Sequence, residues 1–353
     1  MARNKRTKKE SLRKFSEKRI FDKMFATVLK PTDLKPYFFK MKRQPRNDEI
    51  SITTLITVDR FDTLLNSMKT FDGPYSVTLH IFDDEFLQEN LDKLNNFLII
   101  NLKTIENRLD LHLIVDKFTR QLNYFRNVAR FFSRTDILLP LDVDFIVNKN
   151  FIPNLKSNDF VQRKLRSGKG IFILPAFEYQ DEWVNTTFDR FPQTKAEVIS
   201  QFGTNLTIFH GRRNKGHTST RYSKWLTSTD VYPIRPDTIR YEPYAIFNKT
   251  YVPWSDERFT GYGGNKAAWW YEIYLSGLEF WVLPYDFVIH IYHGYPEVRD
   301  NERIKNTPII LNFVSEICSR YKTMFLRKEE EKDLEELQEF EMMGCYEKLK
   351  RIP

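Results

Sequence analysis

Two hydrophobic periods alternate along the first half of the chain. Short β-branched and apolar runs are typical of strands that are buried on both faces, and they cover residues 50–58, 76–82, 109–115 and 137–141. Apolar residues at helical spacing lie between these runs, over residues 59–71, 84–97 and 120–133. Strands that alternate with helices of this length predict βαβ units and a parallel sheet.

The second half of the chain is less regular. A strand is predicted over residues 171–177, and the polar, aromatic stretch 178–243 shows few clear periods. Gly261, Gly263 and Gly264 predict a tight loop before a helix over 267–275, and short strands follow at 280–283 and 288–289. A charged helix with a narrow apolar stripe is predicted over 326–350. We expect one α/β domain over 47–300, a basic extension over 1–46 and a helical extension over 301–353.

The net charge of +8 is concentrated in the N-terminal arm. Residues 1–46 hold 16 Lys or Arg and four acids, so the arm carries +12 and the remaining 307 residues carry −4. The arm could contact RNA, anionic lipid or an acidic partner, or it could be a solvated tail. The mildly acidic body argues against nucleic acid as the main partner.

The two cysteines, Cys318 and Cys345, exclude a disulfide framework and a Cys-based zinc site. The chain contains no uninterrupted apolar run of ~18 residues, so no membrane span is predicted. No apolar region of a signal peptide follows the charged start. These features predict a soluble cytoplasmic protein if Met1 is the native start, and a Golgi-lumenal one if an N-terminal anchor is missing.

Candidate chemistry lies where the strand over 137–141 ends. Asp142 and Asp144 follow this strand directly, and side chains two residues apart in an extended segment point the same way. Ligands of open parallel sheets gather at this edge. Both carboxylates could therefore bind one Mn²⁺ or Mg²⁺ ion, with Val143 behind them. The alternative is a chance D-x-D motif that caps the strand.

A further metal ligand is expected from histidine. His290 and His293 follow the predicted strand at 288–289, and imidazole suits Mn²⁺, although a lone histidine can equally be a hydrogen-bonded core residue. Arg126 and Asn127 precede the Asp142 strand on a helix, where they could bind phosphate or base, or could simply be solvated. The role of His217 is less determined.

An ordered series of segments resembles glycosyltransferase family 49. The longest is Asp256-Glu257-Arg258-Phe259-Thr260-Gly261-Tyr262-Gly263-Gly264-Asn265-Lys266, which is followed by Glu272, by Phe280-Trp281-Val282-Leu283-Pro284 and by His290. The other segments are Val58-Asp59-Arg60, Gly73-Pro74, Asn123-Tyr124-Phe125-Arg126-Asn127-Val128-Ala129, Leu141-Asp142-Val143-Asp144-Phe145, Pro175-Ala176-Phe177-Glu178, Phe191-Pro192-Gln193-Thr194-Lys195-Ala196-Glu197 and Lys215-Gly216-His217. Together they span roughly residues 50–295. The family includes the glucuronyltransferase domain of the LARGE proteins and the β-1,4-glucuronyltransferase of the dystroglycan pathway.

This resemblance implies a GT-A fold, a Rossmann-like mixed sheet flanked by helices. It also implies an inverting, Mn²⁺-dependent transfer from a UDP-sugar, with UDP-glucuronic acid as the expected donor and an oligosaccharide or glycoprotein as the acceptor. By matching position, Asp142, Asp144 and His290 are the expected metal ligands. The expected nucleotide-sugar residues are Val58, Asp59, Arg60, Arg126, Asn127, Asp142, Val143, Asp144, Lys215, His217 and Lys266.

An inverting transfer needs a carboxylate that deprotonates the acceptor hydroxyl. Many inverting GT-A enzymes place acids after a glycine-rich loop, but Asn265 and Lys266 stand there in this chain. Asp256 and Glu257, just before the loop, are therefore the predicted candidates, with Asp256 slightly favoured. The alternative is a surface acid pair of which one member bonds Arg258.

Other residues have two interpretations each. Lys215, Lys266 or Arg258 could hold a uronate carboxylate. Tyr262, Trp269 and Trp270 could stack on an acceptor sugar, although the two tryptophans could equally belong to the core. Rival functions are the same reaction with UDP-GlcNAc or UDP-xylose, a protein that binds nucleic acid or an anionic surface through the arm, and an inactive scaffold.

Overall fold

A nine-stranded mixed sheet forms the frame of the residues that the computed structural model describes, which are 33–118, 120–180, 191–211, 216–293, 299–326 and Cys345. Its strands, in spatial order, are β1 (Asp33–Phe39), β4 (Leu109–Asp116), β3 (Tyr75–Phe82), β2 (Ile50–Ile56), β5 (Ile137–Pro140), β11 (Tyr244–Asn248), β7 (Gly170–Leu174), β12 (Glu279–Val282) and β10 (Tyr232–Ile234). A second sheet contains β6 (Phe145–Val147), β13 (Val288–His290), β8 (Ala176–Tyr179) and β9 (Leu206–Ile208).

The predicted strands of the first half are confirmed, and they are parallel. β2 pairs in parallel with both β3 and β5, and β3 pairs in parallel with β4. The sheet becomes mixed at β11, which is antiparallel to both β5 and β7. The carboxyl ends of β2, β3, β4 and β5 therefore meet at one edge, and Asp142 lies at that edge, as expected for an α/β fold of this type.

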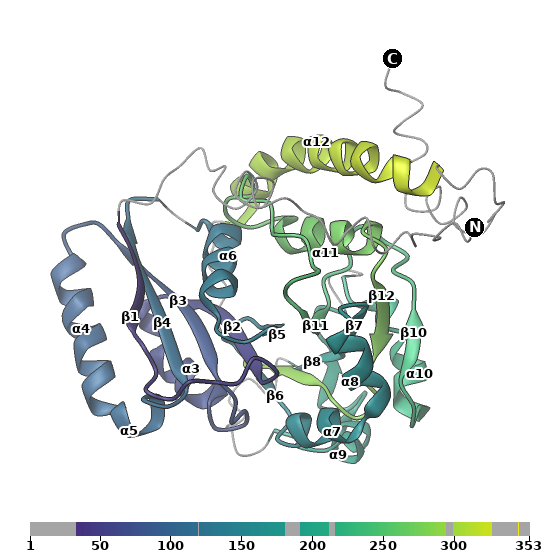
Figure 1. Ribbon diagram of the computed structural model, residues 1–353, viewed down its shortest axis with the longest axis horizontal. Helices are drawn as coiled ribbons and strands as arrows, with labels where there is room; N and C mark the ends of the chain where they lie inside the picture. The colour runs from purple at the N-terminus through teal and green to yellow at the C-terminus, as the bar shows by residue number, and fades with distance from the viewer. Residues whose placement is uncertain are drawn as a thin grey trace, which may run out of the picture.

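Helices cover both faces of the parallel strands (Figure 1). Those of the first half are the short 3-10 helix η1 (Val58–Arg60) with α3 (Phe61–Ser67), α4 (Leu87–Ile100), α5 (Leu102–Ile105) and α6 (Leu122–Phe132). Residues of β4 alternate between the two faces because side chains of a strand have a period of two. Leu111 and Leu113 pack with the α3–α4 side, whereas Ile114 packs with α6.

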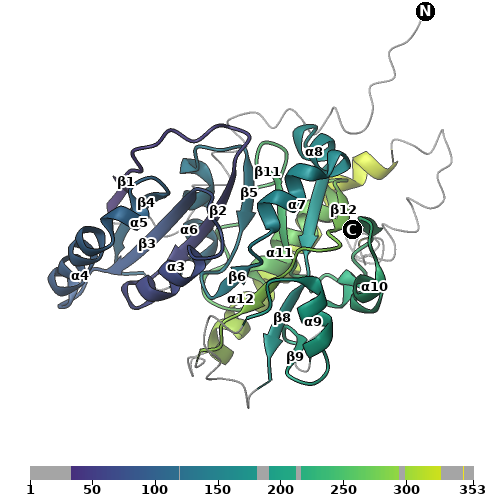
Figure 2. The same cartoon turned by 90° about the horizontal axis from the view of Figure 1, so that it is seen from below.

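The second half contains helices that the sequence pattern does not reveal. They are α7 (Phe151–Ser157), α8 (Asp159–Arg166), α9 (Lys195–Gln201), η4 (Thr218–Thr220), α10 (Tyr222–Thr227) and α12 (Arg299–Leu326). Most are two turns or fewer, too short for periodicity to show. The helix predicted over 267–275 is α11 (Asn265–Leu275). The start of α9 has a readable signal, because Thr194 and Glu197 form a reciprocal capping box. Figure 2 shows these short helices grouped on one side of the molecule.

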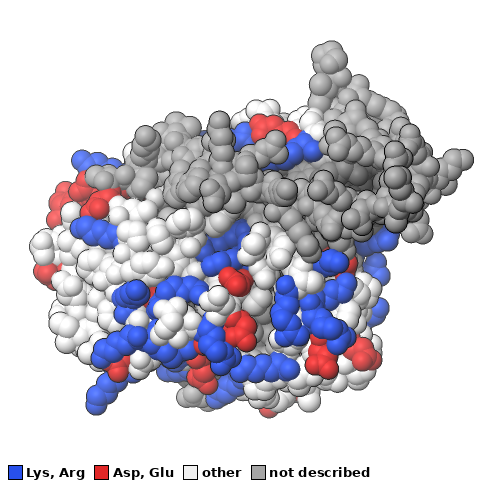
Figure 3. Space-filling model, viewed as in Figure 1, with Lys and Arg blue, Asp and Glu red and all other residues white. Residues whose placement is uncertain are grey.

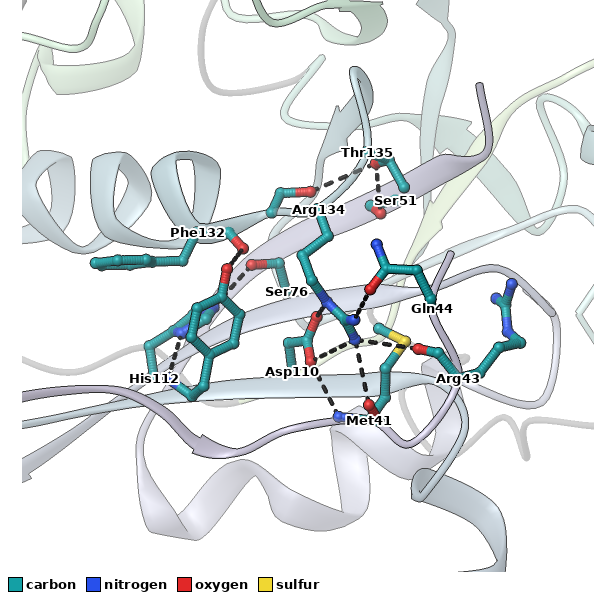
Figure 4. Close-up of polar contacts among 12 residues, drawn as sticks. Met41, Arg43, Gln44, Ser51, Ser76, Asp110, His112, Phe132, Arg134 and Thr135 are labelled. Atoms are coloured by element: carbon teal, nitrogen blue, oxygen red, sulfur yellow. Dashed lines mark hydrogen bonds and ion pairs between the residues drawn. The ribbon is translucent and has the colours of Figure 1, made fainter. Parts of the chain in front are cut away.

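The boundary of the basic N-terminal arm at residue 46 needs correction. Residues 33–39 form β1, which pairs antiparallel with β4 at the sheet edge. Residues 41–44 are also fixed, because the Arg134 guanidinium bonds Asp110, the carbonyl oxygens of Met41 and Arg43, and the Gln44 side chain (Figure 4). The basic residues of this stretch therefore belong to the folded domain. Residues 1–32 lie outside the described part of the chain.

Buried polar groups connect the edge strand β1 through β4 and β3 to α6. His112 on β4 accepts from the Tyr37 backbone amide at 3.1 Å and bonds the Ser76 hydroxyl at 3.0 Å (Figure 4). Ser76 in turn donates to the carbonyl oxygen of Ala129 in α6, at 2.6 Å. Burial lowers the pKa of His112 to about 3, so its ring is neutral and can accept. Each of these polar groups has a hydrogen-bond partner, which offsets the free-energy cost of burying it.

The C-terminal helix differs from its predicted bounds. α12 spans Arg299–Leu326, so the domain boundary placed at residue 300 falls inside this helix, and most of the helix predicted over 326–350 lies outside the described residues. α12 lies across α11 (Figure 1) and buries Phe313, Ile317 and Tyr321 against it. Cys318 of α12 forms a disulfide with Cys345, with a Cα–Cα distance of 5.4 Å.

The surface charge is unevenly distributed. In the view of Figure 3, Lys and Arg gather over the lower part of the face, with fewer acids among them. Because residues 47–353 carry −4 in total, the basic character of this face is local. None of the helices that the structure describes combines the length and apolar character needed to cross a bilayer.

Candidate active site

The two aspartates of the D-x-D motif lie between the two sheets. β5 ends at Pro140 and β6 begins at Phe145, and the amide of Phe145 donates to the carbonyl oxygen of Asp142 at 3.0 Å. β6 pairs antiparallel with β13 in a register that places His290 opposite Phe145. The Ile291 amide donates to the Asp144 carbonyl oxygen at 2.7 Å. This register brings Asp144 and His290 together, although they are 146 positions apart in the sequence.

Asp144, His290 and His293 form a compact group of potential metal ligands. Their ligand atoms all lie within 4.8 Å of one another. Asp144 Oδ2 lies 2.6 Å from His293 Nε2 and 3.4 Å from His290 Nε2, whereas the buried Asp144 Oδ1 has no hydrogen-bond partner within the described residues. Burial opposes ionisation of Asp144, but hydrogen bonds from both histidines outweigh it and lower its pKa. One carboxylate and two imidazoles are a donor set that suits Mn²⁺.

Asp142 is surrounded by cations instead of histidines. Its Oδ2 accepts from the Tyr244 hydroxyl at 2.8 Å and from the Lys266 ammonium, and Arg126 lies 3.8 Å from Oδ1. Burial would raise the pKa of Asp142, but Lys266 and Arg126 outweigh it and hold the pKa below its usual value. The same burial, reinforced by the two aspartates, raises the pKa of Tyr244. Tyr244 therefore stays a neutral hydrogen-bond donor.

A small cavity adjoins Asp142. It has a volume of about 20 Å³, and its lining includes Thr54, Arg126, Asp142, Tyr244 and Lys266. The hydroxyl of Thr54 is buried there without a hydrogen-bond partner in the described part of the chain. A volume of this size suits one water molecule, which the surrounding polar groups could bind. A nucleotide sugar is much larger, so it would have to lie against the outer side of these residues.

Two further titratable residues approach the same cations. Glu242, just before β11, is partly buried, and its carboxyl interacts with Lys266, Arg126 and the backbone amide of Ala267. Burial, partly offset by these groups, raises the pKa of Glu242. His217 stacks on Tyr244 with ring centroids 6.1 Å apart. Burial, followed by the charge of Lys266, lowers the pKa of His217 to about 3.

The predicted base candidates, Asp256 and Glu257, have different surroundings. The guanidinium of Arg258 bonds both carboxylate oxygens of Asp256, at 2.7–3.2 Å, and also bonds Glu316. Glu257 is buried and accepts from Asn127 Nδ2 at 2.8 Å. Burial raises the pKa of Glu257 to about 8, although the bond from Asn127 partly offsets this. Glu257 is therefore mostly protonated at neutral pH.

The surroundings of four predicted site residues limit what each of them can bind. Asn127 is buried, and its amide bonds Ser255 and Glu257, so it has no free group for a nucleotide. Arg258 is paired with two acids and cannot be the free cation of a uronate site. Trp269 and Trp270 are 4% and 3% exposed, so both belong to the core, which is the second of their two interpretations.

The remaining predicted residues lie at or near the carboxyl edge, or outside the described chain. Val58, Asp59 and Arg60 form η1 directly beyond β2, the parallel neighbour of β5. Val143 packs against the main core between the two aspartates. Lys215 lies outside the described residues.

The sequence pattern missed Glu242 and Tyr244, and gave His293 only as an alternative to His290. Glu242 and Tyr244 follow the stretch without clear periods, and β11 had no predicted strand. A readable signal existed for His293, because it lies three residues after His290 beyond the end of a strand. Nothing in the local pattern marks Glu242, whose position beside Lys266 depends on the packing of β11 against α11.

Comparison with known proteins identifies the family. Residues 116–322, more than half of the chain, match the family described as "Glycosyl-transferase for dystroglycan". The chain therefore belongs to this glycosyltransferase family, and the resemblance found in the sequence is confirmed.

Relatives cover most of this chain but only part of their own length. The xylosyl- and glucuronyltransferase LARGE1 of Homo sapiens is 28% identical over 263 residues, which are 73% of this chain and 33% of the relative. The glycosyltransferase-like protein gnt14 of Dictyostelium discoideum is 29% identical over 284 residues, which are 77% of this chain and 42% of the relative. The chain thus spans about a third of the LARGE1 length.

Solved structures with a similar course of the chain were also found. A crystal structure of GalNAc-T7 with UDP, GalNAc and Mn²⁺ aligns with a TM-score of 0.49 and 14% identity, covering 86% of this chain and 56% of that one. S. aureus TarS in complex with UDP-GlcNAc aligns with a TM-score of 0.42 and 14% identity, over 86% of this chain and 82% of that one.

Proposed function

We propose that this protein transfers a sugar from a UDP-sugar to a hydroxyl group of a glycan, with inversion at the anomeric carbon and with a divalent metal ion. Membership of the glycosyltransferase family supports the reaction class. The observation that carries the proposal is the convergence of Asp144, His290 and His293 beside Asp142 at the carboxyl edge of the sheet. An unpaired, buried carboxylate oxygen on Asp144 fits a cation-binding role.

Asp144, His290 and His293 would hold the metal ion, with Asp142 as the further ligand predicted from the D-x-D motif. When bound, Mn²⁺ neutralises the diphosphate leaving group as the glycosyl bond breaks. Lys266 and Arg126 already lie against Asp142, so the edge of the site is cationic. These two side chains would orient the diphosphate and stabilise the charge that develops on it. Tyr244 fixes the Asp142 carboxylate through its hydroxyl.

The transfer itself requires a base on the acceptor side. The base removes the proton of the acceptor hydroxyl while its oxygen attacks the anomeric carbon, and the bond from that carbon to the diphosphate oxygen breaks to release UDP. Asp256 and Glu257 were predicted for this role, but the first is neutralised by Arg258 and the second is buried. Glu242 is partly buried and lies in the field of Lys266 and Arg126. We therefore propose Glu242 as the base, with Asp256 and Glu257 as the alternatives to be compared. In an inverting transfer the base lies opposite the leaving group, so this role requires the anomeric carbon of the donor to lie between Glu242 and the diphosphate that Lys266 and Arg126 would orient.

Glucuronic acid is the proposed donor sugar, and xylose and GlcNAc are the alternatives. The relatives named xylosyl- and glucuronyltransferases support the first two. A uronate carboxylate needs a cation that is not already paired, and Lys266 and Arg126 are partly engaged by Asp142. Either of them could therefore bind the uronate carboxylate only if the metal ion coordinated Asp142 and so released that cation.

An oxidising compartment such as the Golgi lumen is the proposed location. The disulfide between Cys318 and Cys345 supports this, because disulfides persist mainly in secretory and extracellular environments. An acceptor glycan on a secretory glycoprotein would be available there.

A screen of UDP release tests the proposal directly. The chain is incubated with UDP-glucuronic acid, UDP-xylose, UDP-GlcNAc and UDP-galactose, each with Mn²⁺, with Mg²⁺ and with a chelator. We expect release from UDP-glucuronic acid that depends on Mn²⁺ and increases with an oligosaccharide acceptor. Preference for another donor would correct the sugar alone. An absence of metal-dependent release from every donor would overturn the proposed function.

A further inference from the structure

The glycine-rich loop before α11 lies directly beneath the first turns of α12. Gly261, Gly263 and Gly264 all have positive φ, at 72°, 105° and 76°. A Cβ atom on Gly261 would lie 2.7 Å from Glu302 Cδ, and one on Gly263 would lie 2.9 Å from Arg303 Cγ. Side chains at these positions would force Glu302 and Arg303 to move, in addition to the strain of a positive φ. The glycines therefore serve both the turn geometry and the close approach of α12.

Two side chains of α12 bond the backbone of this loop. Glu302 accepts from the amide of Tyr262 at 2.9 Å. One turn further along the helix, the Asn306 amide donates to the carbonyl oxygens of Thr260 at 3.0 Å and Tyr262 at 2.9 Å. These three bonds fix the three successive peptide groups from Thr260 to Gly263.

Glu302 also contacts the segment that enters α6. Its carboxylate accepts from Arg120, with 3.3 Å between Nε and Oε1. The carbonyl oxygen of Arg120 accepts from the Gly261 amide at 2.8 Å, and the Arg120 guanidinium lies over the Tyr262 ring at 5.4 Å from its centroid. A single carboxylate thus joins the entry of α6 to the entry of α11.

These two helices carry the two cations that face Asp142. Arg126 lies on α6 and Lys266 lies in the first turn of α11. Arg126 also donates to Asn265 Oδ1 at 2.9 Å, across the contact between the helices. The separation of the two cations therefore depends on how the starts of α6 and α11 are held together. Glu302 lies at that junction.

We propose that Glu302, with Asn306, is a positioning residue of the transferase site. It fixes the starts of α6 and α11 so that Arg126 and Lys266 face Asp142 together, in the arrangement that receives the diphosphate. This inference rests on the proposed function for its effect on activity. The C-terminal helix α12 would thus take part in donor binding, although it lies far from Asp142 in the sequence.

Substitutions that separate the two contacts of Glu302 test this role. Glu302→Gln keeps an acceptor for the Tyr262 amide and loses the ionic contact with Arg120, whereas Glu302→Ala loses both. We expect Glu302→Ala to lower kcat/KM by about 10- to 100-fold, the scale of a misplaced binding group, and Glu302→Gln to recover part of this loss. Asn306→Ala should act in the same direction, with the exposed neighbour Thr307→Ala as its control.

The readouts separate positioning from folding. UDP binding with Mn²⁺ is measured by calorimetry, and stability is measured by thermal unfolding. Hydrogen exchange is measured at the amides of residues 261–266. Weaker UDP binding and faster exchange in a variant that is still folded at the assay temperature support the proposal. Kinetics and UDP binding of Glu302→Ala within twofold of the unsubstituted protein would overturn it. So would a loss of activity that only follows the loss of folded protein.

The same set of measurements distinguishes this inference from the proposed function. If the unsubstituted protein neither binds UDP nor releases it from any donor, the proposed function is wrong. In that case the exchange of the 261–266 amides in Glu302→Ala still decides whether Glu302 fixes the loop. Unchanged exchange would then reject the positioning role by itself.

Discussion

His293 Nε2 lies 2.6 Å from Asp144 Oδ2, closer than the 3.4 Å of the predicted ligand His290. The two histidines approach the same carboxylate oxygen from the end of β13, and their ring centroids are 5.4 Å apart. Asp142, in contrast, bonds Lys266 and Tyr244. The proposed metal-binding set is therefore centred on Asp144 and the two histidines.

Removal of either histidine should weaken metal binding. We expect His290→Ala and His293→Ala each to lower the affinity for Mn²⁺ by at least about tenfold, because each would lose a proposed direct ligand and even indirect partners of ligands have effects of this size. Asp144→Ala should abolish metal-dependent transfer, and Asp142→Ala should do so as well. The affinity is measured by Mn²⁺ titration in the presence of UDP.

His210→Asn provides the matched control for these substitutions. His210 lies near the site but outside the three-residue group, and its positive φ of 55° is tolerated by asparagine. Its Mn²⁺ affinity should equal that of the unsubstituted protein. A His293→Ala variant with unchanged Mn²⁺ affinity would remove His293 from the site and leave the predicted set of Asp142, Asp144 and His290.

Glu242→Gln should lower kcat with little effect on donor binding. Glutamine has the same shape and retains an acceptor for the Ala267 amide, but it cannot take the acceptor proton. We expect a fall in kcat of about 10²- to 10⁴-fold, the usual contribution of general base catalysis. The Kd of UDP with Mn²⁺ should stay within about threefold of its original value, because the side chains proposed to bind the diphosphate, Lys266 and Arg126, are unchanged.

Asp256→Asn and Glu257→Gln, assayed beside Glu242→Gln, decide between the candidates. Substitution of Asp256 breaks its pair with Arg258, so its effect should appear in thermal stability more than in kcat. A large fall in kcat confined to Glu257→Gln would instead assign the base to Glu257 and reject Glu242. Equal, small effects of all three would exclude a carboxylate base at these positions.

The parallel half of the fold was predictable because its signals are local. The strands that become β2 to β5 are continuous apolar runs, and α6 has a clear helical period. The region of β8 to β10 has three- and four-residue strands and helices of two turns or fewer. Elements of that length are stabilised by tertiary contacts rather than by their own pattern, so a single sequence cannot reveal them.

The site was predictable where it follows a strand and not where it depends on packing. Asp142 and Asp144 follow β5 directly, and the family resemblance added His290. The position of Glu242 requires β11 to pair between β5 and β7, and the role of Arg126 depends on Asn265 across a helix contact. Trp269 and Trp270 show the converse, because residues typical of sugar sites are here part of the core.

A buried carboxyl just before β13 should govern part of the pH dependence of stability. Asp286 accepts from Asn148 and Asn154, and burial raises its pKa from 3.8 to about 7. Between these values the folded state keeps a proton that the unfolded state has lost. Stability therefore falls as the pH rises from about 4 to about 7, by up to about 4 kcal/mol.

Asp286→Asn removes this titration and keeps an oxygen acceptor for both asparagines. Near pH 4 the variant should unfold at the same temperature as the unsubstituted protein, and above pH 7 it should unfold several degrees higher. The measurement is thermal unfolding from pH 4 to pH 8, with the exposed Asp159→Asn as the control. Parallel curves for Asp286→Asn and the unsubstituted protein would show that Asp286 is ionised in the fold.

Reduction of the disulfide should destabilise the C-terminal helix and its packing on α11. Cys318 and Cys345 are 27 residues apart, and closing a loop of this length stabilises the folded state by about 3.5 kcal/mol in the chain-entropy description. We expect a reducing agent to lower the unfolding temperature of the unsubstituted protein. The double substitution Cys318→Ser and Cys345→Ser should show the same lowered temperature and no response to the reductant.

Because α12 holds the glycine-rich loop through Glu302 and Asn306, UDP binding should weaken in parallel with the lower unfolding temperature. An unfolding temperature that does not respond to reduction in the unsubstituted protein would mean that these two cysteines are not paired in solution.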